Sequence, residues 1–307
     1  IYFARPTQRM MIQQPFDGTK RDHFADRGQI LDYALTLGPG RMLDLGPGDG
    51  WPSLPLALLG REVVGVDGSR RRVEVCAANA AKRGIRNASF VLVAPGSPLP
   101  FADGSFDGVA AASSIEQTPD SRATMQELFR VLKPGGRLRM HYESLGYYRG
   151  RGEREADLDT DALTVYDRHV DEEYVTHYQV IFDEQAEAVK RVVADLKDDG
   201  AEAVIELEPV RILCGHAIDA ATWTTIHPSC RTWLGWLGEA GFGSADPTYD
   251  GGWFAKRLFD RLPVPDRPAG IDAVDAMLRP IVGVVVGMKA QPVANPGEWD
   301  PWLTAPK

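Results

Sequence analysis

The feature that most constrains the fold is a regular alternation of strand-like and helix-like segments between residues 41 and 143. Five short runs rich in apolar residues are separated by helical patterns and by turns containing glycine, proline or aspartate. Strands that alternate with helices in this way form parallel sheets covered by helices. The expected strands are residues 41–45, 62–66, 88–93, 106–113 and 136–142, and the expected helices are residues 19–37, 52–59, 69–83 and 119–132.

A glycine-rich turn follows the first expected strand and reads Leu43-Asp44-Leu45-Gly46-Pro47-Gly48-Asp49-Gly50. Glycines let the backbone approach a ligand without an intervening Cβ, and the helix that follows begins with unpaired N–H groups. Asp67 ends the second strand, 21 residues after Gly46, where a carboxylate can accept hydrogen bonds from both ribose hydroxyls. The strand, the turn and the acid together predict a nucleoside-binding site.

The spacing of the glycines disfavours two common nucleotide ligands. A dinucleotide fold has G-x-G-x-x-G, whereas here the third glycine is Gly50 and the bulky Trp51 follows it. The chain also lacks G-x-x-x-x-G-K-[ST], the loop that cradles the phosphates of ATP. NAD and ATP are therefore not the expected ligands.

Two later segments extend the pattern: residues 99–107 read Leu-Pro-Phe-Ala-Asp-Gly-Ser-Phe-Asp, and residues 130–136 read Arg-Val-Leu-Lys-Pro-Gly-Gly. With Asp44-x-Gly46-x-Gly48-x-Gly50 and Asp67 they make the chain similar to class I methyltransferases, particularly the ubiquinone-biosynthesis-like branch. The resemblance covers roughly residues 20–145 and resumes near 233–242 and 281–288. It implies an α/β fold with a Rossmann-like, seven-stranded, doubly wound sheet and an inserted α+β cap after the fifth strand.

The same resemblance implies S-adenosylmethionine as the cofactor. Asp44 and residues 46–48 would line its methionine part, Asp67 would bind the ribose, and residues 94–97 would flank the adenine. The expected cofactor-binding residues are Asp44, Gly46, Pro47, Gly48, Asp67, Gly68, Ala94, Pro95, Ser97 and Ser113. Pro95 departs from the family, whose members commonly have an aspartate there that accepts from the adenine amino group. We therefore expect the backbone of Ala94 or Gly96, or Ser97, to hold the adenine.

A catalytic base is needed only when the methyl acceptor must lose a proton, and three side chains are candidates for that role. They are His227, Glu116 and His141. Each also has a structural interpretation: Glu116 as a capping or cofactor-side residue, His141 as a satisfied sheet residue and His227 as part of a turn before Pro228. The fourth strand ends in Ser113-Ser114-Ile115-Glu116 rather than Asn-Pro-Pro-Tyr, which disfavours methylation of nucleobases or glutamine.

The second half of the chain predicts an insertion. Residues 1–145 are interpreted as the cofactor-binding core with an N-terminal helical lid, residues 146–220 as a cap that selects the substrate, and residues 221–307 as the remainder of the core. In the cap we expect a strand at 174–182, a helix at 184–196 and a strand at 203–207. In the last part we expect a helix at 231–242 and a final strand at 281–288.

Charge and composition limit the partners. The net charge of −9 gives no basic surface for nucleic acid, and no apolar run reaches the roughly 18 residues of a membrane span. Three scattered cysteines and the absence of a signal pattern predict a cytoplasmic protein. Cys214-x-His216 and His227-x-x-Cys230 do not match the usual zinc spacings, so no metal is expected. The expected partner is a small-molecule substrate, and a homodimer is compatible with the sequence.

The sequence favours a methyltransferase acting on a small molecule, and two alternatives stay open. One is an enzyme that binds S-adenosylmethionine for other chemistry, such as decarboxylation, cyclisation or hydroxylation. The other is a nucleoside-binding partner without catalysis.

Overall fold

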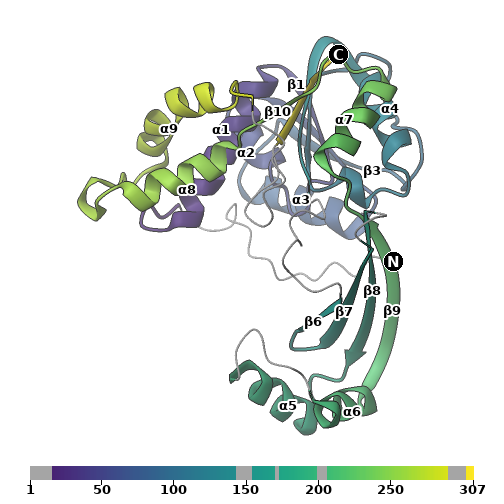
Figure 1. The fold of residues 1–307 in the computed structure, drawn as a ribbon. Coiled ribbons are helices and arrows are strands. Elements are labelled where there is room, and N and C mark those ends of the chain that lie inside the picture. Colours follow the sequence, from purple (N-terminus) through teal and green to yellow (C-terminus); the bar gives the residue numbers. More distant parts are fainter. Residues whose placement is uncertain (1–15, 143–153, 170–172, 199–205, 290–301) are drawn as a thin grey trace. The chain divides into compact units, whose positions relative to one another are not determined.

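The computed structural model describes residues 16–142, 154–169, 173–198, 206–289 and 302–307 (Figure 1). The chain forms two compact units. The larger unit contains Ile1–Glu143, Cys230–Ala294 and Trp299–Lys307, and the smaller unit contains Ser144–Ser229 and Asn295–Glu298. We describe each unit by itself.

The larger unit is built on a seven-stranded sheet of order β10-β11-β5-β4-β1-β2-β3. Strands β1 to β5 are parallel to one another, and β11 is antiparallel to both β5 and β10. This arrangement confirms the predicted doubly wound α/β fold. The strands are β1 (Arg41–Leu45), β2 (Glu62–Asp67), β3 (Ala88–Leu92), β4 (Phe106–Ala112), β5 (Leu132–His141), β10 (Asp246–Thr248) and β11 (Trp302–Pro306).

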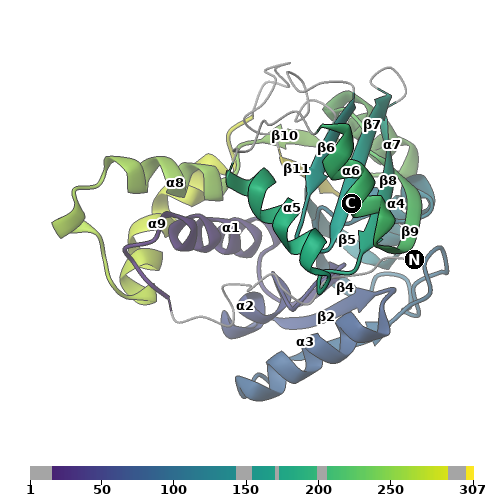
Figure 2. The same ribbon diagram turned by 90° about the horizontal axis from the view of Figure 1, so that it is seen from below.

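Helices cover both faces of this sheet because the side chains of each buried strand alternate between the faces. In β1, Leu43 packs into the apolar cluster that includes Leu128 of α4 and Leu237 of α7. The neighbouring Met42 packs into the cluster formed with α1 and α2. Helix α3 runs beside β2 (Figure 2) and also contacts β3. These helices are α1 (Arg21–Leu37), α2 (Ser53–Leu58), α3 (Arg70–Lys82), α4 (Ser121–Val131) and α7 (Cys230–Ala240).

Two further helices, α8 (Gly251–Arg261) and α9 (Ile271–Val285), pack against α1. Gly28 allows the close crossing of α1 and α8, since a Cβ there would lie 2.4 Å from the carbonyl oxygen of Gly251. A buried ion pair ties this layer to the sheet: Arg139 of β5 donates to both carboxylate oxygens of Asp32, each at 2.7 Å, and both side chains are fully buried. Asp32 also accepts the N–H of Gly251 at 2.9 Å, so one carboxylate joins α1, β5 and the start of α8.

The final strand predicted at 281–288 is wrong, because those residues form the end of α9 and the turn after it. Val274, Leu278, Val282 and Val285 are buried at helical spacing. A short apolar run does not by itself distinguish a strand from a buried helix segment. The strand that pairs with β5 in the structure is β11.

The smaller unit is a four-stranded antiparallel sheet of order β6-β7-β8-β9 with two helices, which confirms the α+β cap predicted after the fifth strand. Leu163 and Phe182 of the sheet pack with Val189 and Val192 of α5 and Leu213 of α6. The elements are β6 (Arg154–Leu158), β7 (Ala162–His169), β8 (Tyr174–Phe182), α5 (Glu187–Asp198), α6 (Leu207–Gly215) and β9 (Ala217–Ile226). Residues 203–205 of the strand predicted at 203–207 lie outside the described residues, and Leu207 begins α6.

Candidate functional site

The carboxyl ends of the parallel strands bring most of the predicted site residues to one edge of the larger sheet. Leu45, Asp67, Ala112 and His141 end β1, β2, β4 and β5. In open α/β sheets, ligands bind at this edge, where the strand order reverses on either side of the first strand. Here β1 lies between β2 and β4, so the reversal falls at the glycine turn.

The glycine turn approaches Ser114, two residues after β4, so closely that its first glycine has no room for a side chain. Gly46 has φ +71°, and a Cβ there would lie 2.8 Å from Cβ of Ser114. Gly48 also has a positive φ, +58°, but the space where its Cβ would be is open. The turn thus leaves an open backbone surface at Gly48, of the kind that can approach a ligand.

Three side chains of α3 hold this turn in place. Arg72 of α3 pairs with Asp49 at 2.5 Å, and Asn79 donates to the carbonyl oxygen of Asp49 at 2.8 Å. The thiol of Cys76 donates to the carbonyl oxygen of Gly48 at 3.2 Å. Cys76 is fully buried, and burial raises the pKa of its thiol, as expected for a packing residue rather than a reactive one.

Asp44 is a fully buried carboxyl group directly before the turn. Ser53 donates to Asp44 Oδ2 at 2.5 Å, whereas Oδ1 has no hydrogen-bond partner among the described residues. Burial raises the pKa of Asp44 from 3.8 to about 7, and the nearby Asp67 adds to the rise. A buried carboxyl with an oxygen left over is suited to a cationic group that the protein itself does not provide.

The ribose and adenine candidates surround the end of β2. Asp67 is partly buried, accepts the N–H of Ser69 at 2.8 Å, and has its pKa raised by burial. Gly68 packs against Pro95, because a Cβ at Gly68 would lie 2.8 Å from Pro95 Cγ. Ala94 and Ser97 form an exposed turn closed by a 3.0 Å bond from the Ser97 N–H to the Ala94 carbonyl oxygen. The structure therefore brings Pro95 beside the residue that follows the acid.

Two predicted residues meet at the ends of β4 and β5. Ser113 Oγ lies 2.9 Å from His141 Nδ1, and the Ser113 N–H donates to the His141 carbonyl oxygen at 2.9 Å. Ser113 has φ +48°, which is uncommon for a residue other than glycine and typical of functional sites. Burial and the charge of Arg139 lower the pKa of His141 to about 4, so its imidazole is neutral at neutral pH.

The other two catalytic candidates are placed differently. Glu116 lies in a short 3-10 helix, Ile115–Gln117, just after Ser113, and is buried. His227 belongs to the smaller unit, where its Nε2 lies 2.8 Å from Thr225 Oγ1. The same hydroxyl lies 2.8 Å from Nε2 of His177, so one threonine bridges two imidazole rings.

Two neighbours of the site were not predicted. Ser53 belongs to none of the predicted motifs, and Ser114 belongs only to the run Ser113-Ser114-Ile115-Glu116 after β4. Ser114 is buried, packs on Gly46, and its Oγ has no hydrogen-bond partner among the described residues. Small hydroxyl residues are common everywhere in a sequence, so only their placement beside Asp44 and Gly46 indicates a role.

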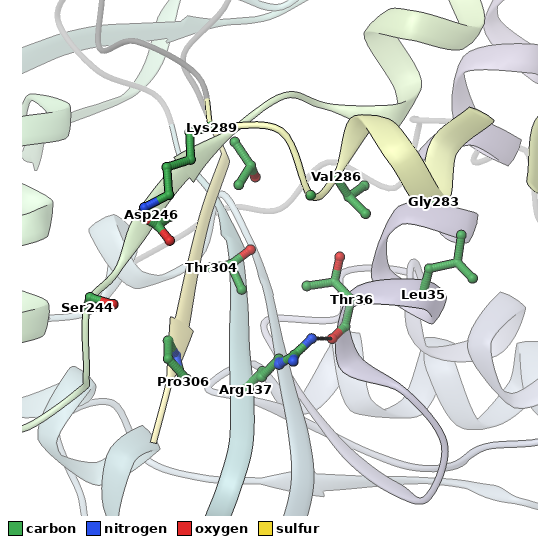
Figure 3. A pocket seen from close by; sticks show the side chains of 12 residues that line it. Leu35, Thr36, Arg137, Ser244, Asp246, Gly283, Val286, Lys289, Thr304 and Pro306 are labelled. Atoms are coloured by element: carbon green, nitrogen blue, oxygen red, sulfur yellow. Dashed lines mark hydrogen bonds and ion pairs between the residues drawn. The ribbon is translucent and has the colours of Figure 1, made fainter. Parts of the chain in front are cut away.

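A pocket of about 490 Å³ also lies in the larger unit, but away from this edge (Figure 3). Its walls come from α1, β5, β10, β11 and the end of α9, and they include Thr36, Arg137, Asp246, Thr248, Lys289 and Thr304. Lys289 pairs with Asp246 at 2.8 Å across its rim. None of the predicted cofactor-binding residues lines it.

Among the residues that the structure describes, no three histidine, cysteine, aspartate or glutamate side chains gather as they would around a metal ion. Within the same part of the chain, no helix has the length and apolar character needed to cross a bilayer.

Comparison with known proteins identifies the type of domain that contains the glycine turn. Residues 43–140 match the family model described as a methyltransferase domain. The chain carries a class I S-adenosylmethionine-dependent methyltransferase domain. Within that domain, the orphaned oxygen of Asp44, the open backbone at Gly48 and the acid Asp67 fit the ammonium group, the amino-acid part and the ribose of the cofactor.

Relatives of the methyltransferase domain share only part of their length with this chain. An uncharacterized protein from Mycobacterium tuberculosis is 39% identical over 113 residues, which are 36% of this chain and 40% of that protein. The demethylmenaquinone methyltransferase from Thermus thermophilus is 39% identical over 114 residues, which are 36% of this chain and 51% of that protein. The chain thus matches about half or less of the length of these relatives.

Solved structures show the same fold as the methyltransferase domain. The CcbJ methyltransferase from Streptomyces caelestis has a TM-score of 0.52 at 16% identity, covering 74% of this chain and 85% of that one. An S-adenosylmethionine-dependent methyltransferase from Clostridium acetobutylicum also has a TM-score of 0.52, at 10% identity, covering 92% and 89%.

Proposed function

We propose that this protein transfers the methyl group of S-adenosylmethionine to a small-molecule acceptor. The observation that carries the proposal is the buried carboxyl of Asp44, whose Oδ1 has no partner among the described residues, at the glycine turn beside Asp67. An unpaired buried carboxylate costs stability, and a cationic ligand that binds it would offset this cost. The matching family model and the fold support the same conclusion.

In this proposal the chain's own residues bind and orient the cofactor. Asp44 would hold the ammonium group through Oδ1, and Asp67 would accept hydrogen bonds from the ribose hydroxyls. The remaining residues proposed to contact the cofactor are Gly46, Pro47, Gly48, Gly68, Ala94, Pro95, Ser97 and Ser113. When bound, S-adenosylmethionine supplies a methyl group on a positively charged sulfur.

The acceptor is proposed to be a small molecule selected by the smaller unit. This unit is inserted in the chain directly after β5, whose last residue, His141, lies at the edge with the glycine turn. Loops and insertions at this edge carry specificity in α/β enzymes, because the sheet below them is rigid. The net charge of −9 disfavours nucleic acid as the acceptor.

The test is a combination of binding and transfer. Calorimetry should show that S-adenosylhomocysteine binds the wild-type protein and binds Asp67→Ala at least about tenfold more weakly, since the ribose loses its acceptor. Asp103→Ala is the matched control, because Asp103 is an exposed aspartate that precedes β4 at the opposite edge of the sheet. Its affinity should equal that of the wild type.

Methyl-labelled cofactor then separates the three functions that the sequence left open. Label in a small-molecule product supports methyl transfer. A converted but unlabelled product would indicate other chemistry with the same cofactor, and binding without any product would indicate a nucleoside-binding protein. If neither the cofactor nor S-adenosylhomocysteine binds the folded chain, the proposal is wrong altogether.

A further inference from the structure

Ser113 and His141 form a hydrogen-bonded pair at the edge where the cofactor is proposed to bind. Their side chains meet at 2.9 Å because Ala112 of β4 and His141 of β5 are register partners in the parallel sheet. The following residue, Ser114, packs on Gly46. The pair is thus beside the turn that is proposed to bind the methionine part of the cofactor.

The backbone at Ser113 directs this side chain in a way that an ordinary strand would not. Its φ of +48° lies in the left-handed region, which is unfavourable for a residue with a Cβ. Gln117 donates to its carbonyl oxygen at 2.6 Å, and its N–H is held by the carbonyl oxygen of His141. Both backbone groups of Ser113 are therefore fixed, and the hydroxyl is aimed at one nitrogen of the imidazole.

We propose that Ser113 and His141 form a proton relay that takes the proton of a hydroxyl group on the methyl acceptor. This inference rests on the proposed methyl transfer. It assigns His141 Nδ1 as the hydrogen-bond acceptor and Ser113 Oγ as the atom that contacts the substrate hydroxyl. The acceptor is accordingly an alcohol or a phenol.

The acceptor oxygen forms a bond to the methyl carbon, and the electron pair of the breaking carbon–sulfur bond returns to sulfur, which becomes a neutral thioether. The acceptor's O–H bond breaks as its proton moves to Ser113 Oγ, while the original hydroxyl proton of Ser113 moves to His141 Nδ1. His141 becomes an imidazolium and later releases this proton to water.

The chemistry of the acceptor follows from how weak this base is. With a pKa of about 4, His141 is a poor base for an ordinary hydroxyl group. A hydroxyl that has gained a methyl group is an oxonium, which is far more acidic and gives its proton even to such an imidazole. A methylated alkylamine keeps a pKa near that of lysine, roughly 10, and would not pass its proton to this group. The relay therefore suits oxygen acceptors and not alkylamines.

The first measurement needs no acceptor. In ¹⁵N-labelled protein bound to S-adenosylhomocysteine, the side-chain NMR signals of His141 are assigned by their loss in His141→Asn. We expect Nδ1 to be unprotonated and Nε2 to carry the hydrogen. A protonated Nδ1 would mean that the histidine donates to Ser113, which would overturn the relay.

The second measurement uses ¹³C-methyl S-adenosylmethionine with phenol and with two matched pairs of probes: benzyl alcohol with benzylamine, and cyclohexanol with cyclohexylamine. Labelled O-methyl products are expected, and an N-methyl product at a comparable rate would contradict the proposal. Loss of S-adenosylhomocysteine binding, in contrast, would contradict the proposed function itself.

The variants separate a relay from a merely structural pair. Ser113→Gly removes the hydroxyl but tolerates φ +48°, and His141→Asn can keep the hydrogen bond but cannot take a proton. His141→Asn should bind S-adenosylhomocysteine like the wild type, because His141 is not among the residues proposed to contact the cofactor. Both variants should lower the maximal rate of O-methylation by about 10²-fold or more, without raising the KM of the acceptor. His216→Asn, an exposed histidine of the smaller unit, is the control and should keep full activity. Unchanged turnover in either relay variant would overturn the proposal.

Discussion

The pKa of Asp44 leads to a prediction about how cofactor affinity depends on pH. Its rise from 3.8 to about 7 spans roughly three units, and each unit corresponds to about 1.4 kcal/mol, so ionising this carboxyl in the cofactor-free protein costs about 4 kcal/mol. An ammonium group that binds Asp44 requires the ionised form. Below about pH 7 the affinity should therefore fall about tenfold per pH unit, and at about pH 5 it should be about 100-fold weaker than its plateau.

The sign of the effect on stability is opposite to the usual one for aspartate. Because the folded protein holds this proton more tightly than the unfolded chain, the contribution of Asp44 to the free energy of unfolding falls as pH rises from about 4 to about 7. Cofactor binding restores a partner to the ionised carboxyl. The stabilisation by S-adenosylhomocysteine should consequently be largest near neutral pH.

Calorimetry with two ligands isolates Asp44 from the other acids. S-adenosylhomocysteine has the ammonium group, whereas 5′-methylthioadenosine keeps the nucleoside and lacks the amino acid. Asp67, whose pKa is also raised, affects both ligands alike, so the difference between their pH profiles belongs to the ammonium site. Asp44→Asn should lose this difference. If both ligands show the same profile in the wild type, Asp44 does not bind the ammonium group.

Three further predictions concern single contacts. Gly46→Ala should weaken S-adenosylhomocysteine binding at least about tenfold, because its Cβ would clash with Cβ of Ser114. Gly60→Ala is the control: Gly60 has a similar φ of +86° but open space around it, so this change should cost about 1–2 kcal/mol of stability and leave the calorimetric affinity unchanged. Asp32→Ala should lower the free energy of unfolding in urea by about 3–5 kcal/mol, because the buried charge of Arg139 loses its carboxylate partner. An apolar replacement of both residues should recover part of this loss, and an equal loss in both variants would contradict the reasoning. Thr225→Val should lower the free energy of unfolding by about 1–3 kcal/mol, because it removes the hydroxyl that bridges the two histidines. An unchanged urea midpoint would show that the bridge contributes nothing to stability.

Much of the larger unit was predictable because its pattern is local. The strands predicted at 41–45 and 62–66 agree with β1 and β2 to within one residue, and the helix predicted at 69–83 exceeds α3 by one residue at each end. Their boundaries coincide with glycines, an aspartate and a serine N-cap that accepts the N–H of Arg72. Such signals act within a few residues of the chain, so the sequence displays them directly.

The candidate site was predictable only in part. The glycine turn and Asp67 are recognisable because their spacing is fixed by one βαβ unit. The contact between Ser113 and His141 joins residues 28 apart through the register of two strands, and the packing of Ser114 on Gly46 spans an even longer stretch of chain. No local pattern encodes such pairs.

The sequence by itself determined the parallel α/β core and the place of its nucleoside site, because hydrophobic periodicity and glycine turns follow from neighbouring residues. Tertiary structure alone decided whether residues 281–288 became a strand or the end of α9, since an apolar run satisfies either until its partners are known. It also decided that Asp44 would keep one oxygen without a partner and that Ser113 would face His141. These properties depend on burial and on contacts between distant segments, which exist only once the sheet has formed.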